Sequence, residues 1–197
     1  MMELCVKNLE HVWFGVAYDK EEVFATSFAS SEEAALKGLL QSIPFDAPFQ
    51  CSQKKISAYA ERIINALKNI YDGKDSPQNF SLVTKHLSEY TKRVLEVARL
   101  IPLGYVTSYG AVARAIGGSP RAVGRIMALN PFAPIVPCHR VVGSDFSLVG
   151  YGGGLEAKLA FLKREKRGYT SEKKVSVNGK KLEVWPAEFA LRKFEKK

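Results

Sequence analysis

Alternating hydrophobic and polar positions near the start of the chain predict a small sheet. Between residues 12 and 18 the bulky side chains fall at every second position, and residues 23–28 resume this pattern after a polar stretch at 19–21. A period of two is typical of strands that bury one face, and the polar stretch predicts a turn between them.

Further along, the hydrophobic period changes from two to about 3.6, which predicts helices. Ser30 and Glu33 have the spacing of a capping box before the Ala- and Leu-rich run 31–42. Residues 45–52 predict a loop, and apolar side chains then recur at helical spacing over residues 56–70.

Proline, glycine and polar residues divide the chain. The segment 74–80 (KDSPQNF) is typical of a linker, so the pattern predicts an α/β domain over 1–80 and a mainly helical domain over 81–168. Residues 169–197 form a basic extension, in which Asn178-Gly179 between two extended stretches predicts a β-hairpin.

Helix signals in the second domain gather around two serines. Ser108 is placed to cap a short helix that runs to Ile116, and Ser119 is placed to cap a second helix that begins at Pro120. The tight turn Gly117-Gly118 between them makes this a helix-turn-helix pattern. Two longer helices are predicted at 84–99 and 155–166.

The second short helix carries the features of a surface that approaches another molecule. Arg121, Gly124 and Ala128 fall on one stripe, with Arg125 beside it. Small residues allow close approach, and arginines favour a nucleic acid as the partner. The alternative is that Gly124 only lets another helix pack closely.

Charge is unevenly distributed. The net charge is −3 over residues 1–80, +5 over 81–162 and +7 over 163–197, which sums to +9. This distribution indicates a polyanionic partner for the second half, although a basic tail can equally serve solubility. The chain has three cysteines, no long apolar run and no secretory pattern at its start, so we expect a cytoplasmic protein without disulfides or membrane segment.

The stretch PCHRVVG, residues 137–143, places a cysteine beside a histidine. A thiol reacts as its thiolate, and a histidine can remove the proton. Neighbours on a strand point to opposite faces, so Cys138 and His139 would need a turn at Pro137 and a shared water to cooperate. We interpret Cys5 and His11 as unsuited to a metal site and Cys51 as a buried thiol.

Five motifs, from IPLGYVTSYGAVA (101–113) through SPRAVGRIMALNP (119–131), PCHRVVG and GYGGG (150–154) to FLKRE (161–165), resemble in order those of the O6-alkylguanine-DNA alkyltransferases. The resemblance covers residues 84–168. It implies a winged helix-turn-helix in the C-terminal domain and a ribonuclease-H-like small sheet with helices in the N-terminal α/β domain.

The resemblance also assigns catalytic roles. Cys138 is expected to accept the alkyl group, and His139 to take its proton through a water. Glu165 is expected to orient the histidine, and Tyr109 to stabilise the departing guanine.

DNA and pocket roles follow in the same way. Arg121 is expected to fill the space of an extruded base, with Arg125 and the helix starts at Ser108 and Ser119 near phosphates. The remaining expected pocket and support residues are Asn130, Val141, Tyr151 and Gly152. Family members often have Gly or Ala where Arg125 stands and serine where Gly152 stands.

The implied function is repair of duplex DNA. A monomer would flip out O6-alkylguanine, and also O4-alkylthymine, and move the alkyl group irreversibly to Cys138 without cofactor or metal. The thioether product has no carbonyl for water to attack, so one turnover per chain is expected. Two alternatives are a lesion-binding protein without catalysis, which would lack the cysteine, and a Cys-His hydrolase, which would not need the helix-turn-helix.

Overall fold

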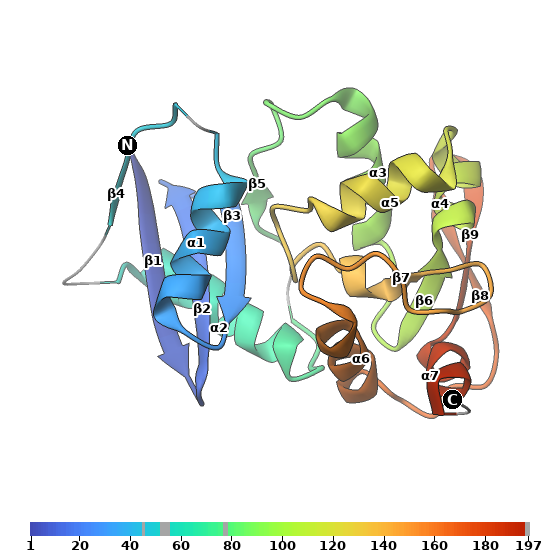
Figure 1. The fold of residues 1–197 in the computed structure, drawn as a ribbon. Helices are drawn as coiled ribbons and strands as arrows, with labels where there is room; N and C mark the ends of the chain where they lie inside the picture. Colours follow the sequence, from blue (N-terminus) through green and yellow to red (C-terminus); the bar gives the residue numbers. More distant parts are fainter. Residues whose placement is uncertain (45, 52–55, 77–78, 196–197) are drawn as a thin grey trace. The chain divides into compact units, whose positions relative to one another are not determined.

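The computed structural model describes residues 1–44, 46–51, 56–76 and 79–195 (Figure 1). The chain folds into two compact units. The first consists of Met1–Tyr71, Asp75–Leu87 and Pro131–Ile135, and the second of Asp72–Lys74, Ser88–Asn130 and Val136–Lys197.

The first unit is a five-stranded sheet in the order β4-β1-β2-β3-β5. Its central three strands form an antiparallel meander, and the two short outer strands run parallel to their neighbours. The strands are β1 (Met2–Leu9), β2 (Val12–Asp19), β3 (Glu22–Ala29), β4 (Phe49–Cys51) and β5 (Ser81–Leu82).

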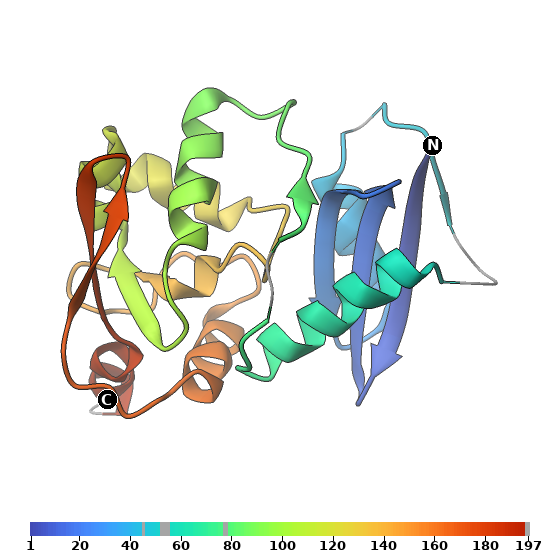
Figure 2. The same cartoon turned by 180° about the vertical axis from the view of Figure 1, so that it is seen from behind.

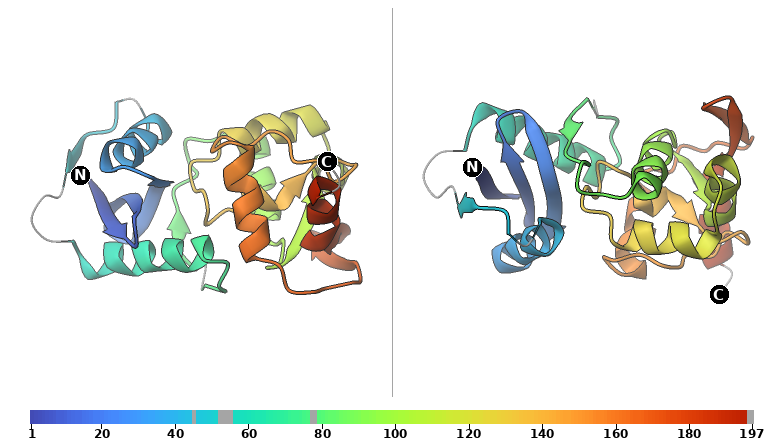
Figure 3. Two further views of the ribbon diagram at one scale, coloured as in Figure 1. Left: turned by 60° about the horizontal axis from the view of Figure 1, so that its bottom comes forward. Right: turned by 90° about the horizontal axis from the view of Figure 1, so that it is seen from above.

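A helix covers each face of this sheet, α1 (Glu32–Ser42) on one and α2 (Ala58–Tyr71) on the other (Figure 3, left). Alternation along β2 explains the two layers. Ala17 joins Leu39 of α1 in a buried cluster, whereas Phe14 on the opposite face packs edge-on against Tyr71 of α2, with ring centroids 5.6 Å apart.

The strands predicted within residues 12–28 correspond to β2 and β3, whereas β1, β4 and β5 were not predicted. Two details differ from expectation. The side chain of Ser31, not Ser30, caps α1 by accepting from the Ala34 backbone N–H at 3.2 Å. Cys51 is exposed, because it lies on the edge strand β4 where the pattern predicted a loop and a buried thiol.

The second unit contains the remaining helices and a four-stranded sheet in the order β7-β6-β9-β8 (Figure 2). Its elements are α3 (Glu89–Arg99), β6 (Tyr105–Ser108), α4 (Tyr109–Ile116), α5 (Pro120–Ala128), the 3-10 turn Cys138–Arg140, β7 (Val141–Val142), α6 (Leu155–Arg164), β8 (Lys173–Val177), β9 (Lys180–Pro186) and α7 (Ala187–Glu195).

Both predicted caps of the helix-turn-helix are confirmed. The side chain of Ser108 accepts from the Ala111 backbone N–H at 3.0 Å, and that of Ser119 accepts from Ala122 at 3.2 Å. Helix α3 begins at Glu89, capped by Ser88, so it is shorter than the helix predicted from residue 84.

Residues beyond 168 are part of the core of the second unit. Val106 of β6 and Leu162 of α6 pack with Ala187, Ala190 and Leu191 of α7 in one buried cluster. The extension therefore contributes apolar contacts to the same core as β6 and α6.

The described residues contain neither a membrane-spanning helix nor a cluster of metal-ligating side chains. No helix there has the length and apolar character needed to cross a membrane. Nor do three or more His, Cys, Asp or Glu side chains gather in those ranges as a metal site would require.

Candidate active site

Cys138 and His139 lie in a tight turn. Pro137 precedes the turn, and its carbonyl accepts from the Arg140 backbone N–H at 2.9 Å. The two side chains are 3% and 0% exposed. A 3-10 turn removes the alternation of a strand, so the geometric objection to cooperation between the two residues does not apply here.

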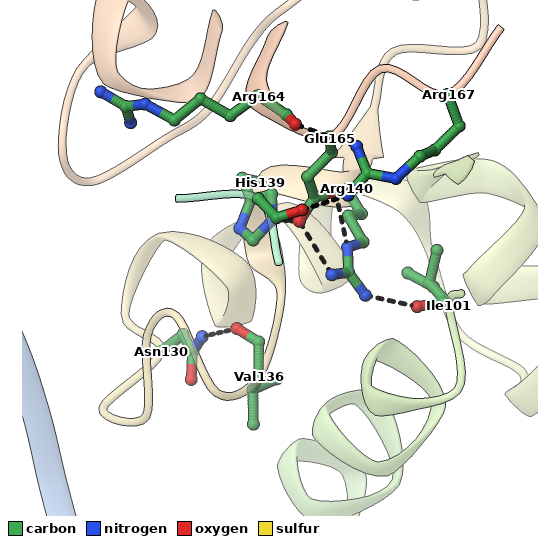
Figure 4. Close-up of polar contacts among 9 residues, drawn as sticks. Ile101, Asn130, Val136, His139, Arg140, Arg164, Glu165 and Arg167 are labelled. Carbon is green, nitrogen blue, oxygen red and sulfur yellow. Dashed lines mark hydrogen bonds and ion pairs between the residues drawn. The ribbon is translucent and has the colours of Figure 1, made fainter. Parts of the chain in front are cut away.

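A buried charged cluster lies directly behind the histidine (Figure 4). His139 Nε2 is 2.9 Å from Glu165 Oε1. Arg140 donates to both oxygens of the same carboxylate, from Nε at 2.9 Å and from Nη2 at 2.8 Å, and donates from Nη1 to the Ile101 carbonyl at 2.7 Å. Phe161 stacks on the histidine ring, with centroids 4.5 Å apart.

The cluster sets the protonation of its members. Burial alone would raise the pKa of Glu165, but its hydrogen bond with His139 and the charge and hydrogen bonds of Arg140 outweigh burial and hold that pKa well below its ordinary value. Burial lowers the pKa of His139 below 6.5 despite the neighbouring carboxylate. Because Arg140 already neutralises Glu165, the carboxylate is ionised while the histidine is neutral at physiological pH.

A neutral histidine held in this way can act as a base. Its Nε2 donates to Glu165, which leaves Nδ1 as the acceptor, and Nδ1 is buried without a hydrogen-bond partner among the described residues. Burial raises the pKa of the Cys138 thiol above 9.0, with smaller opposing effects from Asn130 and Lys158. The thiol is therefore protonated at rest and needs a base to react.

Lys158 is a buried cation that the sequence interpretation missed. Its Nζ donates to the Val141 carbonyl at 2.6 Å, the Val149 carbonyl at 2.9 Å and the Tyr109 hydroxyl at 3.2 Å. Burial lowers its pKa to about 8. Its position in the helix could have predicted this burial, because Lys158 lies three residues before Phe161 and therefore on the buried face of α6.

Arg140 was also missed as a site residue, although it lies inside the PCHRVVG motif. Its partner Glu165 is 25 positions away. Nothing local in the sequence indicates that pairing. Glu165 itself, which could have been a solvated residue at a helix end, is fully buried.

Tyr109 and Asn130 connect the helix-turn-helix to this site. The Tyr109 hydroxyl donates to the Val149 carbonyl at 2.7 Å, and the side chain is buried. Asn130, two residues after α5 ends, donates from Nδ2 to the Val136 carbonyl at 2.8 Å (Figure 4). These bonds fix the two helices against the segments before and after the cysteine.

The loop 150–154 supplies Tyr151 and Gly152. The Tyr151 hydroxyl is buried without a hydrogen-bond partner in the described part of the chain, and burial raises its pKa. A Cβ on Gly152 would lie 2.9 Å from the Ala128 carbonyl at the end of α5. A serine at this position would therefore force the loop away from the helix.

Arg121 and Arg125 lie on the exposed side of α5, outside the buried cluster. Neither forms a hydrogen bond or ion pair with any residue in the described ranges. The structure thus brings together Cys138, His139, Glu165, Tyr109, Asn130 and Val141 around the turn, and leaves the two arginines on the surface of the second helix.

This architecture matches known proteins. Residues 89–167 match the family model "6-O-methylguanine DNA methyltransferase, DNA binding domain". That segment is therefore similar to the DNA-binding domain of the 6-O-methylguanine DNA methyltransferases. The match begins at α3 and ends just after Glu165, so it contains every element of the candidate site described above.

Curated proteins with similar sequences match the same part of the chain. A methylated-DNA--protein-cysteine methyltransferase of Pyrobaculum aerophilum is 52% identical over 80 residues, which cover 41% of this chain and 53% of that protein. The chain thus spans about half the length of the curated relatives it matches.

Solved alkyltransferases share the fold over more of the chain. The O6-methylguanine-DNA methyltransferase of Pyrococcus kodakaraensis has a TM-score of 0.62 and 28% identity, covering 84% of this chain and 99% of that one. Mycobacterium tuberculosis OGT in complex with DNA has a TM-score of 0.65 and 26% identity, covering 83% and 92%. The sheet-plus-helix N-terminal unit and the helical C-terminal unit both belong to this architecture.

Proposed function

We propose that this protein repairs duplex DNA by moving the alkyl group of O6-alkylguanine, and of O4-alkylthymine, onto its own Cys138. The observation that carries this proposal is the buried Cys138-His139-Glu165-Arg140 arrangement at the end of a capped helix-turn-helix. A nucleophile, a base and a fixed orienting group lie next to a DNA-binding motif.

The first chemical step is removal of the thiol proton. A water carries the proton from Cys138 to Nδ1 of His139, and Glu165 stabilises the imidazolium that results. Arg140 keeps the carboxylate ionised and in place. The burial that raises the thiol pKa also makes the thiolate poorly solvated, which increases its reactivity once it forms.

The thiolate then attacks the alkyl carbon. A carbon–sulfur bond forms as the carbon–oxygen bond breaks, and the electron pair remains on O6 of guanine. Tyr109 would have to turn its hydroxyl away from the Val149 carbonyl to donate to the departing base, and Lys158 supports that hydroxyl from the other side. The Val141 carbonyl keeps a second lone pair for the exocyclic amine of guanine.

The nucleotide must leave the base stack for this attack, because O6 of a stacked base is not open to in-line approach. Arg121, exposed near the start of α5, is placed to enter the vacated space. Arg125 and the helix starts after Ser108 and Ser119 lie where backbone phosphates could be contacted. The thioether is not hydrolysed, so each monomer in the cytoplasm acts once without a cofactor.

Analysis of the DNA product tests this function. A duplex with one O6-methylguanine is incubated with excess protein and digested to nucleosides. Wild-type protein should convert O6-methylguanine to guanine, and the Cys138→Ser variant should leave it unchanged. Equal loss of the lesion with both proteins, or with neither, would refute the proposal.

A further inference from the structure

Glu188 is a buried carboxylate that the proposed chemistry does not use. It lies in the first turn of α7, beyond residues 89–167 that match the family model, and is only 5% exposed. Its Oε1 accepts from the backbone N–H of Arg167 at 3.1 Å and from that of Gly168. A buried carboxylate is costly unless it is hydrogen-bonded, so these two bonds fix the side chain and the turn at 165–168 to each other.

The turn at 165–168 starts at Glu165, which ends α6 and bonds to His139 through its carboxylate. Arg167 is two positions further along the chain (Figure 4). Backbone N–H groups beyond the end of a helix need acceptors from another element, and Glu188 of α7 supplies one to Arg167. Because the turn follows Glu165 directly, its position determines where the Glu165 carboxylate lies.

The start of α7 also binds the loop that follows α3. The Ala187 backbone N–H donates to the Gly104 carbonyl at 2.9 Å. A Cβ added to Gly104 would lie 3.2 Å from the Glu165 carbonyl oxygen, so this loop and the turn after α6 are in close contact. Ile101, at the beginning of the loop, accepts from Arg140 Nη1 at 2.7 Å. The first turn of α7 therefore binds both backbone segments that hold the Glu165–Arg140 pair.

We propose that Glu188 is a positioning residue for alkyl transfer, because it fixes the turn at 165–168 and thereby holds the Glu165 carboxylate against His139. Displacing a catalytic group by about 1 Å through a distant substitution can lower a rate on the order of 100-fold. This inference rests on the proposed function, because the position of Glu165 affects transfer only if His139 is the base. It assigns the extension 169–197 a part in the chemistry as well as in packing.

The test measures single-turnover transfer from a duplex with one O6-methylguanine over a range of protein concentrations in excess. Each curve gives a limiting rate constant and a half-saturating concentration. Glu188→Ala removes the acceptor, and Glu188→Gln keeps an acceptor oxygen in the same place. The control Leu191→Ala truncates a buried side chain of the same helix and leaves the carboxylate intact. Thermal unfolding measures the stability of every variant, and transfer is compared at a temperature where all are folded.

Glu188→Ala should lower the limiting rate constant by roughly 10–100-fold. Its half-saturating concentration should stay at the wild-type value, because α5 and its arginines are untouched. Glu188→Gln should recover most of the rate, and Leu191→Ala should transfer at nearly the wild-type rate even where it is less stable than Glu188→Ala. If Glu188→Ala is unfolded, Glu188→Asp replaces it, because the shorter side chain keeps its charge but cannot reach both N–H groups in the same position; its limiting rate constant should also fall.

Equal limiting rate constants for the Glu188 variants and Leu191→Ala would overturn the positioning role. So would a change confined to the half-saturating concentration, or a Glu188→Gln variant as slow as Glu188→Ala. If wild type repairs the lesion in these cases, the proposed function stands and only the role of Glu188 fails. If wild type does not repair the lesion, both proposals fail.

Discussion

Glu165 shows how one buried carboxylate can serve both chemistry and stability. It accepts from Arg140 through both oxygens and from His139 through one. A buried carboxylate without partners would become protonated, and a protonated group could not stabilise an imidazolium. In the proposed mechanism Arg140 therefore has a positioning role, because it keeps Glu165 ionised.

Replacing Glu165 with Gln should reduce both alkyl transfer and stability. The substitution leaves Arg140 buried without a counter-charge, and breaking a buried pair in this way costs about 3–5 kcal/mol. Urea unfolding measures the loss, and single-turnover kinetics under folding conditions measure the rate. The control is Glu156→Gln on the exposed side of the same helix. Equal stability of the two variants would contradict the account.

The pH dependence of transfer should report His139. Its pKa lies below 6.5, so the rate should fall as the pH drops through that pKa and Nδ1 becomes protonated, and it should not rise steeply above pH 6.5. Because the thiol pKa lies above 9.0, a mechanism without the histidine would give a different profile. A rate that rises about tenfold per pH unit from 6.5 to 9 would show direct ionisation of Cys138 and exclude the base.

At the scale of elements, the sequence predicted those features whose interacting residues are neighbours in the chain. Ser108 and Ser119 cap helices a few residues away, and Asn178-Gly179 forms the turn of a hairpin. Pairing of β9 with β6, about 80 residues earlier in the chain, has no local signal. The extension 169–197 therefore looked like a basic tail, although it completes a sheet.

Leu182→Ala should destabilise the protein as a core substitution does. Leu182 is fully buried in β9, so its truncation should lower the free energy of unfolding by about 2–5 kcal/mol. Lys181→Ala, at the neighbouring exposed position, should change it by about 0.5 kcal/mol or less. Denaturant unfolding measures both. A loosely attached extension would instead leave Leu182→Ala as stable as Lys181→Ala.

At the scale of the molecule, the order of motifs predicted a candidate site whose residues the fold brings together, but it did not predict every residue of the buried cluster. Cys138, His139 and Asn130 fall within or beside recognisable motifs. Lys158 and Arg140 act through partners that only the fold brings close: Lys158 lies in a helix with an ordinary local pattern, and Arg140, although inside PCHRVVG, pairs with a residue 25 positions away.

The two units also differ in charge, because the N-terminal part of the sequence is acidic and the later parts are basic. The acidic N-terminal part of the sequence forms a sheet closed by a helix on each face, and the basic parts contribute the helix-turn-helix, the site and the hairpin. Charge patterning therefore predicted the part for which we propose DNA contact, whereas the packing of residues 169–197 required the structure.

The central claim is that Cys138 itself keeps the alkyl group. The most direct measurement is the intact mass of the protein after reaction with excess duplex carrying O6-methylguanine, followed by peptide mapping. The account predicts a gain of one methylene per chain, which stops at one, lies in the peptide with Cys138 and is absent in Cys138→Ser. An unmodified protein after the lesion has been repaired, or a methyl group on another residue, would contradict it.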